Sequence, residues 1–361
     1  MGRNVRLASV GTVTALACAA GVATAAPALA AGWRNVDGKA STAFTGGLDR
    51  VDFASKNVGW AIGSGGSLLS PRTRFARWTS AGWSAQASPV GFAPTDIAVA
   101  SVSRAWAVGY NLDGVVALYW NGAKWAKVAY PGAGLPSQVA AAADGTAYSL
   151  SSLNANSGGL GKVLRWTGSA WADAKVALPA SSVATAVDVR SKSDVWLAGT
   201  TSTGTAVTGW VMHYNGTSWK RTAVPGSLGT AAYQAVLHKI VAVSATTVYV
   251  LRDAQQSQTT NALLRYDGKT WKTANTPLLA AGIGLAADGK GGAVVLRVST
   301  RNKSMYLHYN GTSWSTLYGP VRTGASVQAS DIDRRPGTAG VVSVGAAARS
   351  GKNSPFIELY G

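Results

Sequence analysis

Cysteine, histidine and glutamate are nearly absent from this chain of 361 residues. It has one cysteine, Cys18, one glutamate, Glu358, and three histidines. A single cysteine excludes a disulfide framework within the chain. Too few cysteines, histidines and acidic clusters occur to predict a tight metal site, and no cofactor is expected. With one glutamate and 14 aspartates, no pair of carboxylates is marked for glycosidase chemistry. We therefore predict that the protein is not an enzyme.

Helical periodicity and membrane-spanning stretches are also missing from the chain after residue 31. The first 31 residues differ, because Arg3 and Arg6 precede an apolar run that ends in the small residues Ala28-Leu29-Ala30. This pattern is typical of a secretory signal peptide. We therefore predict a signal peptide over residues 1–31, one domain over residues 32–361, and a secreted, extracellular protein without a transmembrane anchor.

What the chain does have is a repeat. Seven tryptophans recur at intervals of 42 to 52 residues, namely Trp33, Trp83, Trp125, Trp171, Trp219, Trp271 and Trp314. A period of about 40–50 residues over a whole chain is typical of repeat folds such as propellers. Each repeat contains an aromatic residue, a short polar turn and then the tryptophan, as in the segments 120–125, 214–219, 266–271 and 309–314. Asn-Gly and Asp-Gly turns between apolar runs indicate β-hairpins.

A second motif indicates the remaining strands. A serine lies five residues before an aromatic residue that opens a small apolar strand, as in Ser55 with Trp60, Ser101 with Trp106, and Ser191 with Trp196. Each repeat is thus interpreted as four strands. Most of the 14 tryptophans are expected to pack between repeats.

The two ends of the sequence complete the count. Residues 357–361 resemble the first half of the hairpin motif, and residues 32–36 resemble its second half. We therefore predict an all-β, seven-bladed β-propeller with one blade shared between the N- and C-termini. Such closure removes exposed sheet edges.

The chain is strongly basic, with 33 Lys+Arg against 15 Asp+Glu and a net charge of +18. Without Arg3 and Arg6, 31 basic residues remain against the same 15 acids, which gives +16. This charge favours anionic extracellular polymers as partners, although the basic residues are scattered over all repeats. We predict a glycan or an anionic cell-wall polymer as partner, a possible protein partner in a secreted complex, and no nucleic acid.

Candidate ligand-binding residues lie in the polar loops opposite the Asn-Gly hairpins, where loop lengths vary. The candidates are Tyr110, Asn111, Asp113, Arg252, Gln255, Arg301 and Asn302. Planar polar side chains beside an aromatic ring suit sugar recognition, so Tyr110 with Asn111 and Asp113 forms the favoured cluster. His238 aligns with Asp49, Thr95 and Thr185 at the start of the innermost strands. It is interpreted as an ordinary polar residue at a channel mouth, with a general base as the alternative.

Two families resemble this sequence. Asp267-Gly268-Lys269-Thr270-Trp271 resembles the Asp-box of sialidase-like propellers, but lacks the residue between Asp and Gly, and the family's catalytic Tyr–Glu pair has no counterpart. Residues 32–361 are similar, in repeat architecture and alanine-rich composition, to secreted actinobacterial seven-bladed propellers. These include the propeller lectin subunits of umbrella-type toxin particles. The likeness implies a binding module for glycans or cell surfaces.

The favoured hypothesis is therefore a secreted, non-enzymatic, lectin-like module that binds through its variable loop face, alone or in a larger complex. The alternative is an electrostatic adhesin or structural scaffold that binds anionic wall polymers through its charge. A lyase or glycosidase with a site at the channel mouth is the less favoured third hypothesis.

Overall fold

The computed structural model describes residues 32–37, 46–67, 70–131, 134–152, 161–230, 232–254, 261–274, 282–298 and 301–361. The expected signal peptide lies outside these residues. Residues 32–361 form one compact unit, and every regular element in its described part is a β-strand. Within these ranges, no helix long and apolar enough to cross a bilayer occurs.

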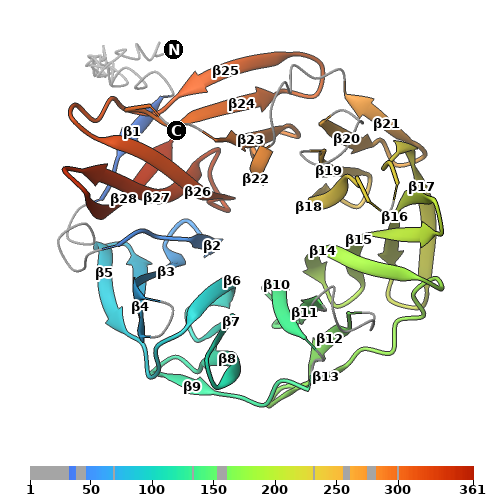
Figure 1. Cartoon of the computed structure of the whole chain (residues 1–361), viewed down its shortest axis with the longest axis horizontal. Coiled ribbons are helices and arrows are strands. Elements are labelled where there is room, and N and C mark those ends of the chain that lie inside the picture. Colours follow the sequence, from blue (N-terminus) through green and yellow to red (C-terminus); the bar gives the residue numbers. More distant parts are fainter. Residues whose placement is uncertain are drawn as a thin grey trace, which may run out of the picture. The chain divides into compact units, whose positions relative to one another are not determined.

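Seven antiparallel four-stranded sheets are arranged around a central channel, which confirms the predicted β-propeller (Figure 1). Each of blades 1 to 6 is formed by four consecutive strands. Blades 1 to 3 comprise β2 (Arg50–Ser55), β3 (Val58–Ser67), β4 (Ser70–Thr79) and β5 (Gly82–Ala87); β6 (Ala93–Ser101), β7 (Arg104–Asn111), β8 (Gly114–Trp120) and β9 (Trp125–Lys127); and β10 (Leu135–Ala141), β11 (Ala147–Ser152), β12 (Val163–Trp166) and β13 (Trp171–Asp173).

Blades 4 to 7 continue around the ring, and the lowest-numbered strand of each sheet except the last lies innermost (Figure 1). They comprise β14 (Ser182–Ser191), β15 (Asp194–Thr203), β16 (Ala206–Tyr214) and β17 (Trp219–Ser227); β18 (Val236–Ser244), β19 (Thr247–Asp253), β20 (Ala262–Tyr266) and β21 (Trp271–Ala274); β22 (Gly282–Ala287), β23 (Ala293–Arg297), β24 (Met305–Tyr309) and β25 (Trp314–Tyr318); and β26 (Ser326–Arg334), β27 (Val341–Arg349), β28 (Lys352–Tyr360) and β1 (Trp33–Asn35).

The predicted closure of the ring is confirmed. Strand β1 pairs antiparallel with β28, with Trp33 opposite Tyr360. One further backbone bond, from Val36 N to Ile357 O at 2.9 Å, extends this pairing. The N-terminal strand therefore completes the four-stranded sheet of the blade that the two termini share, and the edge of β28 is paired.

The turn residues explain both repeated motifs. In the hairpins between third and fourth strands, the Asn or Asp side chain accepts backbone N–H groups from the two turn residues before the tryptophan, as Asn215 does from Thr217 and Ser218. The following glycine, Gly216, has a φ of 93°, a conformation that costs glycine little. The serine motif marks the hairpin between first and second strands, where Ser55 Oγ accepts the N–H of Asn57.

Hydrophobic side chains fill seven separate cores, each between two neighbouring blades. All 14 tryptophans belong to these cores, which confirms the prediction that they pack between repeats. Trp60 of blade 1, for example, is fully buried against Trp120 and Trp125 of blade 2. Many small inter-blade cores let a chain of this length fold as one domain.

One outermost strand contains a proline. Pro225 follows the repeat tryptophan Trp219 by six residues, a spacing at which proline is expected to end the strand, but it lies inside β17. It is tolerated because β17 is the outer edge strand of its sheet, and its register shifts near this point. An edge strand leaves alternate N–H groups without partners, so the missing donor costs little there.

Candidate functional site

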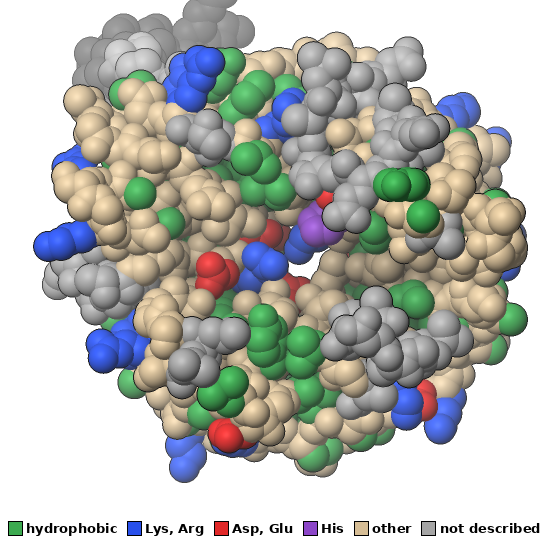
Figure 2. Space-filling model, viewed as in Figure 1, with side chains coloured by type: hydrophobic (Ala, Val, Ile, Leu, Met, Phe, Trp, Pro, Cys, Tyr) green, Lys and Arg blue, Asp and Glu red, His purple; other side chains and the backbone are tan. Residues whose placement is uncertain are grey.

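The two faces of the propeller are built from different connections. On one, which we call the mouth face, lie the starts of the innermost strands, the turns between second and third strands, and the connections between blades. The other, the hairpin face, carries the Asn-Gly and Asp-Gly turns. Figure 2 shows basic, acidic and histidine side chains gathered around the central opening. The six predicted ligand-binding residues that the structure describes belong to connections or strand ends of the mouth face.

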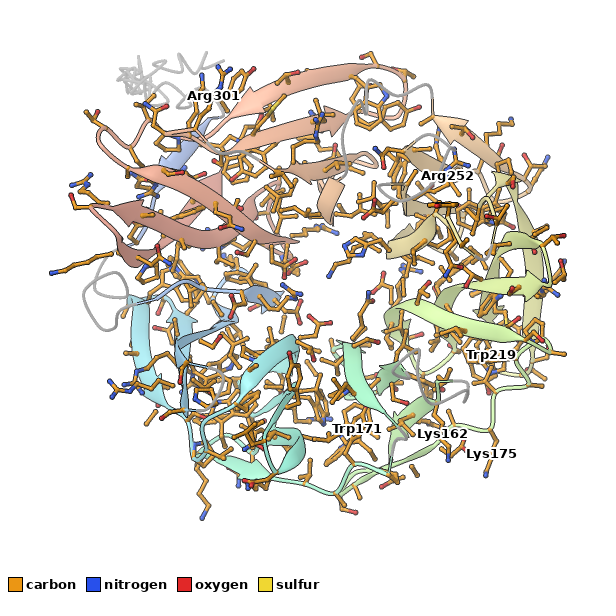
Figure 3. The ribbon with its side chains drawn as sticks, in the orientation of Figure 1. Lys162, Trp171, Lys175, Trp219, Arg252 and Arg301 are labelled. Atoms are coloured by element: carbon orange, nitrogen blue, oxygen red, sulfur yellow. The ribbon has the colours of Figure 1, made fainter. Side chains whose placement is uncertain are left out.

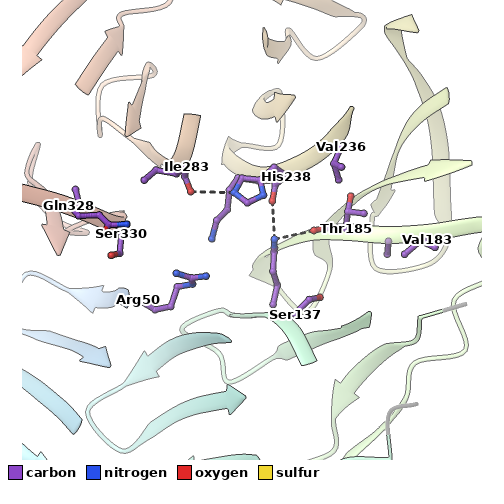
Figure 4. A pocket seen from close by; sticks show the side chains of 13 residues that line it. Arg50, Ser137, Val183, Thr185, Val236, His238, Ile283, Gln328 and Ser330 are labelled. Atoms are coloured by element: carbon purple, nitrogen blue, oxygen red, sulfur yellow. Dashed lines mark hydrogen bonds between the residues drawn. The ribbon is translucent and has the colours of Figure 1, made fainter. Parts of the chain in front are cut away.

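The mouth of the central channel forms a cavity with a volume of about 530 Å³. The starts of innermost strands from several blades line it, with Arg50, Ser137, Gln138, Thr185, His238, Lys239, Gln328 and Ser330 as its polar residues. Figure 4 shows the guanidinium of Arg50 and the imidazole of His238 facing the open centre. This cavity, called the mouth cavity below, contains no carboxylate among its lining residues.

Hydrogen bonds to backbone carbonyl groups, three of them in other blades, fix the side chains of Arg50 and Gln138. Arg50 donates from Nε to Thr95 O and from Nη1 to Asp49 O, both at 2.7 Å. Gln138 Nε2 donates to Thr185 O at 3.0 Å and to His238 O at 2.9 Å (Figure 4). Side chains held in this way are preorganised, which lowers the entropy cost of ligand binding.

His238 lies where the sequence placed it, at the start of the innermost strand β18. Its Nε2 lies 3.3 Å from Ile283 O, a contact in which Nε2 donates (Figure 4). Burial lowers the pKa of His238, and the positive charge of Lys239 lowers it further. The imidazole is therefore neutral at pH 7, and its Nδ1 is an acceptor.

Below the mouth cavity lies a smaller cavity of about 120 Å³, whose walls carry five aspartates. Four of them accept backbone N–H groups from the innermost strand of a neighbouring blade at normal distances. These bonds are Val51 N to Asp331 at 3.1 Å, Phe53 N to Asp333 at 2.9 Å, Val139 N to Asp96 at 2.9 Å and Ala242 N to Asp188 at 2.6 Å. Asp52 accepts from Val99 N in the same manner. The aspartates thus link consecutive blades around the axis.

Two of these carboxyl groups share a proton. Asp52 and Asp333 are hydrogen-bonded to each other, and burial raises the pKa of Asp52 to about 7. Burial, followed by the charge of Asp52, raises the pKa of Asp333 well above its usual value. The two carboxyls titrate as a unit. Asp52 and Asp188 both lie eight residues before the aromatic residue of the second strand, Trp60 and Trp196, and from this repeated position each links its blade to the next.

The favoured loop cluster lies in the turn between β7 and β8, and its polar groups are partly used by the turn itself. Asn111 Nδ2 donates to Gly91 O at 3.1 Å, and Asn111 Oδ1 accepts the N–H of Asp113 at 3.0 Å. The carboxylate of Asp113 is exposed, and Tyr110 is half-buried. Tyr110 and Asp113 are therefore the members that a ligand can reach.

The other predicted residues do not join that cluster. Arg252 lies in β19 of blade 5 and is 6 % exposed, and burial lowers its pKa. Gln255 lies outside the described residues. Arg301 and Asn302, exposed, belong to blade 6, and Figure 3 shows Arg301 far from Arg252. The structure thus distributes the described candidates over three blades.

Sequence reasoning missed Arg50, Gln138 and Lys239. These residues lie ten positions before the aromatic residue of the second strand, at Trp60, Tyr148 and Tyr249 respectively, and Asp96 occupies the same position before Trp106. A polar residue at one register of an otherwise apolar innermost strand indicates a channel-facing position. Comparison of this register across the repeats would have found them.

The other two histidines each lie beside an aspartate, and the single glutamate is buried. His213 Nε2 lies 2.9 Å from Asp194 Oδ1, and His308 Nε2 lies 2.9 Å from Asp288 Oδ2. Glu358 is fully buried in β28. Across the described ranges, no group of three or more His, Cys, Asp and Glu side chains could hold a metal ion.

Exposed apolar side chains distinguish the two faces. Seven large hydrophobic residues of the described chain are strongly exposed, and six of them lie at strand ends or connections of the mouth face. These are Leu112, Leu135, Tyr233, Val298, Tyr318 and Val321, with exposures between 41 % and 67 %. Only Val102 lies on the hairpin face. Exposed apolar surface of this kind is typical of interaction sites.

Comparisons with known proteins show the fold alone. No protein-family model and no curated protein matches the chain. Among solved structures, it is similar to YCF48 bound to a D1 peptide, with a TM-score of 0.55 and 12 % identity over 91 % of this chain and 96 % of that one. It is also similar to a catalytically inactive virginiamycin B lyase from Staphylococcus aureus with quinupristin, with a TM-score of 0.56 and 11 % identity over 92 % and 99 %. A Trypanosoma rangeli sialidase matches with a TM-score of 0.47 and 10 % identity over 87 % and 53 %.

Proposed function

We propose that this protein is a secreted, non-enzymatic binding module that recognises a glycan or an anionic cell-wall polymer through its mouth face. The structural neighbours include both a peptide-bound protein and a lyase, so the proposal depends on the surface of this chain. Secretion is proposed from the pattern of residues 1–31.

The asymmetry of the two faces carries the proposal. The mouth face has the mouth cavity of about 530 Å³ and six of the seven strongly exposed large hydrophobic residues in the described ranges, whereas tight polar turns cover the hairpin face. A rigid scaffold with one variable, partly apolar face is the usual arrangement of binding proteins. Tyr110, Asp113, Arg301 and Asn302 would contact ligand at the rim of this face. Arg252 is not included, because it is buried.

Tyr318 adds an aromatic ring to the predicted rim residues. It is 50 % exposed, and Lys303 Nζ lies 3.9 Å from its ring centroid. Arg301 and Asn302 are held beside this strand end, because Arg322 N donates to Asn302 O at 2.7 Å and Val327 N donates to Arg301 O at 2.8 Å. An aromatic ring beside an amide and a guanidinium is a suitable surface for a sugar ring.

Binding to an array of glycans and purified wall polymers, at low and high salt, tests the proposal. We expect Tyr110→Ala and Tyr318→Ala to weaken selective binding that persists at high salt. Lys124→Ala and Thr217→Ala, which alter exposed turns of the hairpin face, are the matched controls. Equal loss in both sets, or binding to every polyanion that disappears at high salt, would favour the electrostatic adhesin instead.

A turnover assay separates binding from catalysis. His238 offers an unprotonated Nδ1 inside the mouth cavity, so a lyase or glycosidase would use it as a base. Cleavage of any bound polymer by the wild type, lost in His238→Ala, would contradict the non-enzymatic proposal. A pull-down from culture supernatant tests whether the protein works alone or as a subunit of a secreted complex.

A further inference from the structure

The mouth cavity presents two cations from different blades and no carboxylate. Arg50 comes from β2 in blade 1 and Lys239 from β18 in blade 5, and both line the cavity. The Nη2 hydrogens of Arg50 make no hydrogen bond within the part of the chain that the structure describes. Lys239 Nζ lies 3.9 Å from Asp331 Oδ1, too far for a hydrogen bond. Both cations therefore retain donor hydrogens for a ligand.

We propose that the mouth cavity binds an anionic group, a carboxylate or a phosphate, between Arg50 and Lys239. This inference rests on the proposed function and names the part of the glycan or wall polymer that enters the channel. A planar guanidinium and an ammonium are the usual protein partners of both anions. The volume of about 530 Å³ accommodates one sugar residue or a polyol phosphate unit.

The aspartates deeper in the channel do not favour a cationic ligand instead. Each of the five accepts a backbone N–H group from a neighbouring blade, and Asp52 and Asp333 share a proton. One oxygen of each aspartate is thus already used by a backbone N–H group, and a cation entering from the mouth meets Arg50 and Lys239 first. Lys239, which lines both cavities, is the counter-ion of the aspartates.

A neutral sugar bound by stacking also fits the cavity poorly. Its apolar lining residues are Val183, Ala184, Val236, Ile283 and Ala329, and no Phe, Tyr or Trp is among the lining residues. Carbohydrate sites that bind neutral sugars depend on an aromatic face. In this protein, exposed aromatic rings such as Tyr318 lie at the rim, so the rim and the cavity have different roles: rim residues contact sugar faces and the cavity binds the charged group.

Calorimetric titration of the full chain with inorganic phosphate, glucuronate and glucose tests the inference. We expect phosphate or glucuronate to bind, glucose not to bind, and the anion to displace the polymer found in the binding assay. Arg50→Gln and Lys239→Met should each weaken anion binding at least tenfold. Lys220→Met and Arg221→Gln remove the same charges from exposed positions of β17 and should leave it unchanged. These controls separate the site from the net charge of the protein.

Arg50→Lys provides a second variant, because Arg50→Gln also loses the hydrogen bonds to Thr95 O of blade 2 and to Asp49 O, and its thermal unfolding has to be checked. A preference for phosphate assigns a phosphate-bearing polymer, and a preference for glucuronate assigns an acidic sugar. Absence of binding by both anions, or binding unchanged in Arg50→Gln and Lys239→Met, would overturn the inference. The proposed function survives that result if Tyr110→Ala and Tyr318→Ala still weaken polymer binding, so the two failures are distinguishable.

Discussion

The indole ring of Trp33 stacks on the phenol ring of Tyr306, with ring centroids 3.8 Å apart and an angle of 12° between the planes. Trp33 lies in β1 of blade 7, whereas Tyr306 lies in β24 of blade 6. The N-terminal strand is therefore fixed by pairing within its own sheet and by packing against the next blade. Tyr306 also donates from its hydroxyl to Glu358 at 2.9 Å, so the contact joins an aromatic pair to a buried carboxylate.

Replacement of Trp33 should open the closure of the ring. Trp33→Ala removes the stack and the packing on blade 6, and we expect a loss of roughly 2–4 kcal/mol in the free energy of unfolding. Trp219→Ala, at a half-buried position of blade 4, is the matched control. Denaturation gives the loss of stability, and limited proteolysis should reveal early cleavage in blade 7 only for Trp33→Ala. Equal cleavage patterns would show that closure does not depend on this strand.

The buried Glu358 should be essential to the same junction. Its Oε2 accepts hydrogen bonds from Ser304 and Tyr306, and its Oε1 lies 3.5 Å from Arg322 Nε. Glu358→Ala leaves a buried guanidinium and two hydroxyls without this partner, so we expect a loss of about 3 kcal/mol. Glu358→Gln keeps an acceptor and should lose less. Thermal unfolding of both variants measures these losses. Similar losses in the two variants would mean that the negative charge is the important property.

The proton shared by Asp52 and Asp333 should make folding stability depend on pH. The pKa of Asp52 is raised to about 7, above its unfolded value of 3.8. This contribution to stability is therefore present at low pH and is lost as pH rises through about 7. Asp52→Asn keeps an acceptor for Val99 N and cannot ionise. We expect it to raise the melting temperature relative to wild type at pH 8, to raise it less at pH 5, and to leave it nearly unchanged at about pH 4, close to the unfolded pKa of 3.8.

Asp173→Asn is the control for that experiment, because Asp173 lies on an outer strand and a backbone hydrogen bond from Lys175 lowers its pKa. It should give no gain in stability at pH 8. A gain of the same size in Asp173→Asn would assign the effect to net charge rather than to the pair.

His238 should make folding stability depend on pH in the opposite direction. Burial, followed by the charge of Lys239, lowers its pKa below the usual histidine value of 6.5, while Asp253 opposes and Arg50 reinforces the shift. Its contribution to stability is present above pH 6.5 and is lost as pH falls through that range. His238→Gln keeps a donor for Ile283 O and should become relatively more stable than wild type between pH 7 and pH 5. A stability difference that does not vary with pH would contradict this assignment.

The sequence by itself determined the blade count, the shared blade and the packing role of the tryptophans. These features depend on local chemistry that recurs in every repeat. Asn215 and Gly216 specify a tight turn through their own side-chain and backbone preferences, and Trp219 follows at a fixed spacing. The residues that specify one blade lie within about 50 consecutive positions, so a single sequence contains several copies of the same pattern.

Only the tertiary structure decided which residues meet at the axis. Arg50 and Lys239 line one cavity although 189 positions separate them in the sequence, and Asp52 shares a proton with Asp333 from the other end of the chain. Arginine is a residue type common in binding sites, yet Arg252 is buried because of its position in β19. Whether a residue lines the channel depends on its distance from the propeller axis and on its position along that axis. Both are set by the packing of seven blades around the axis, which no single repeat encodes.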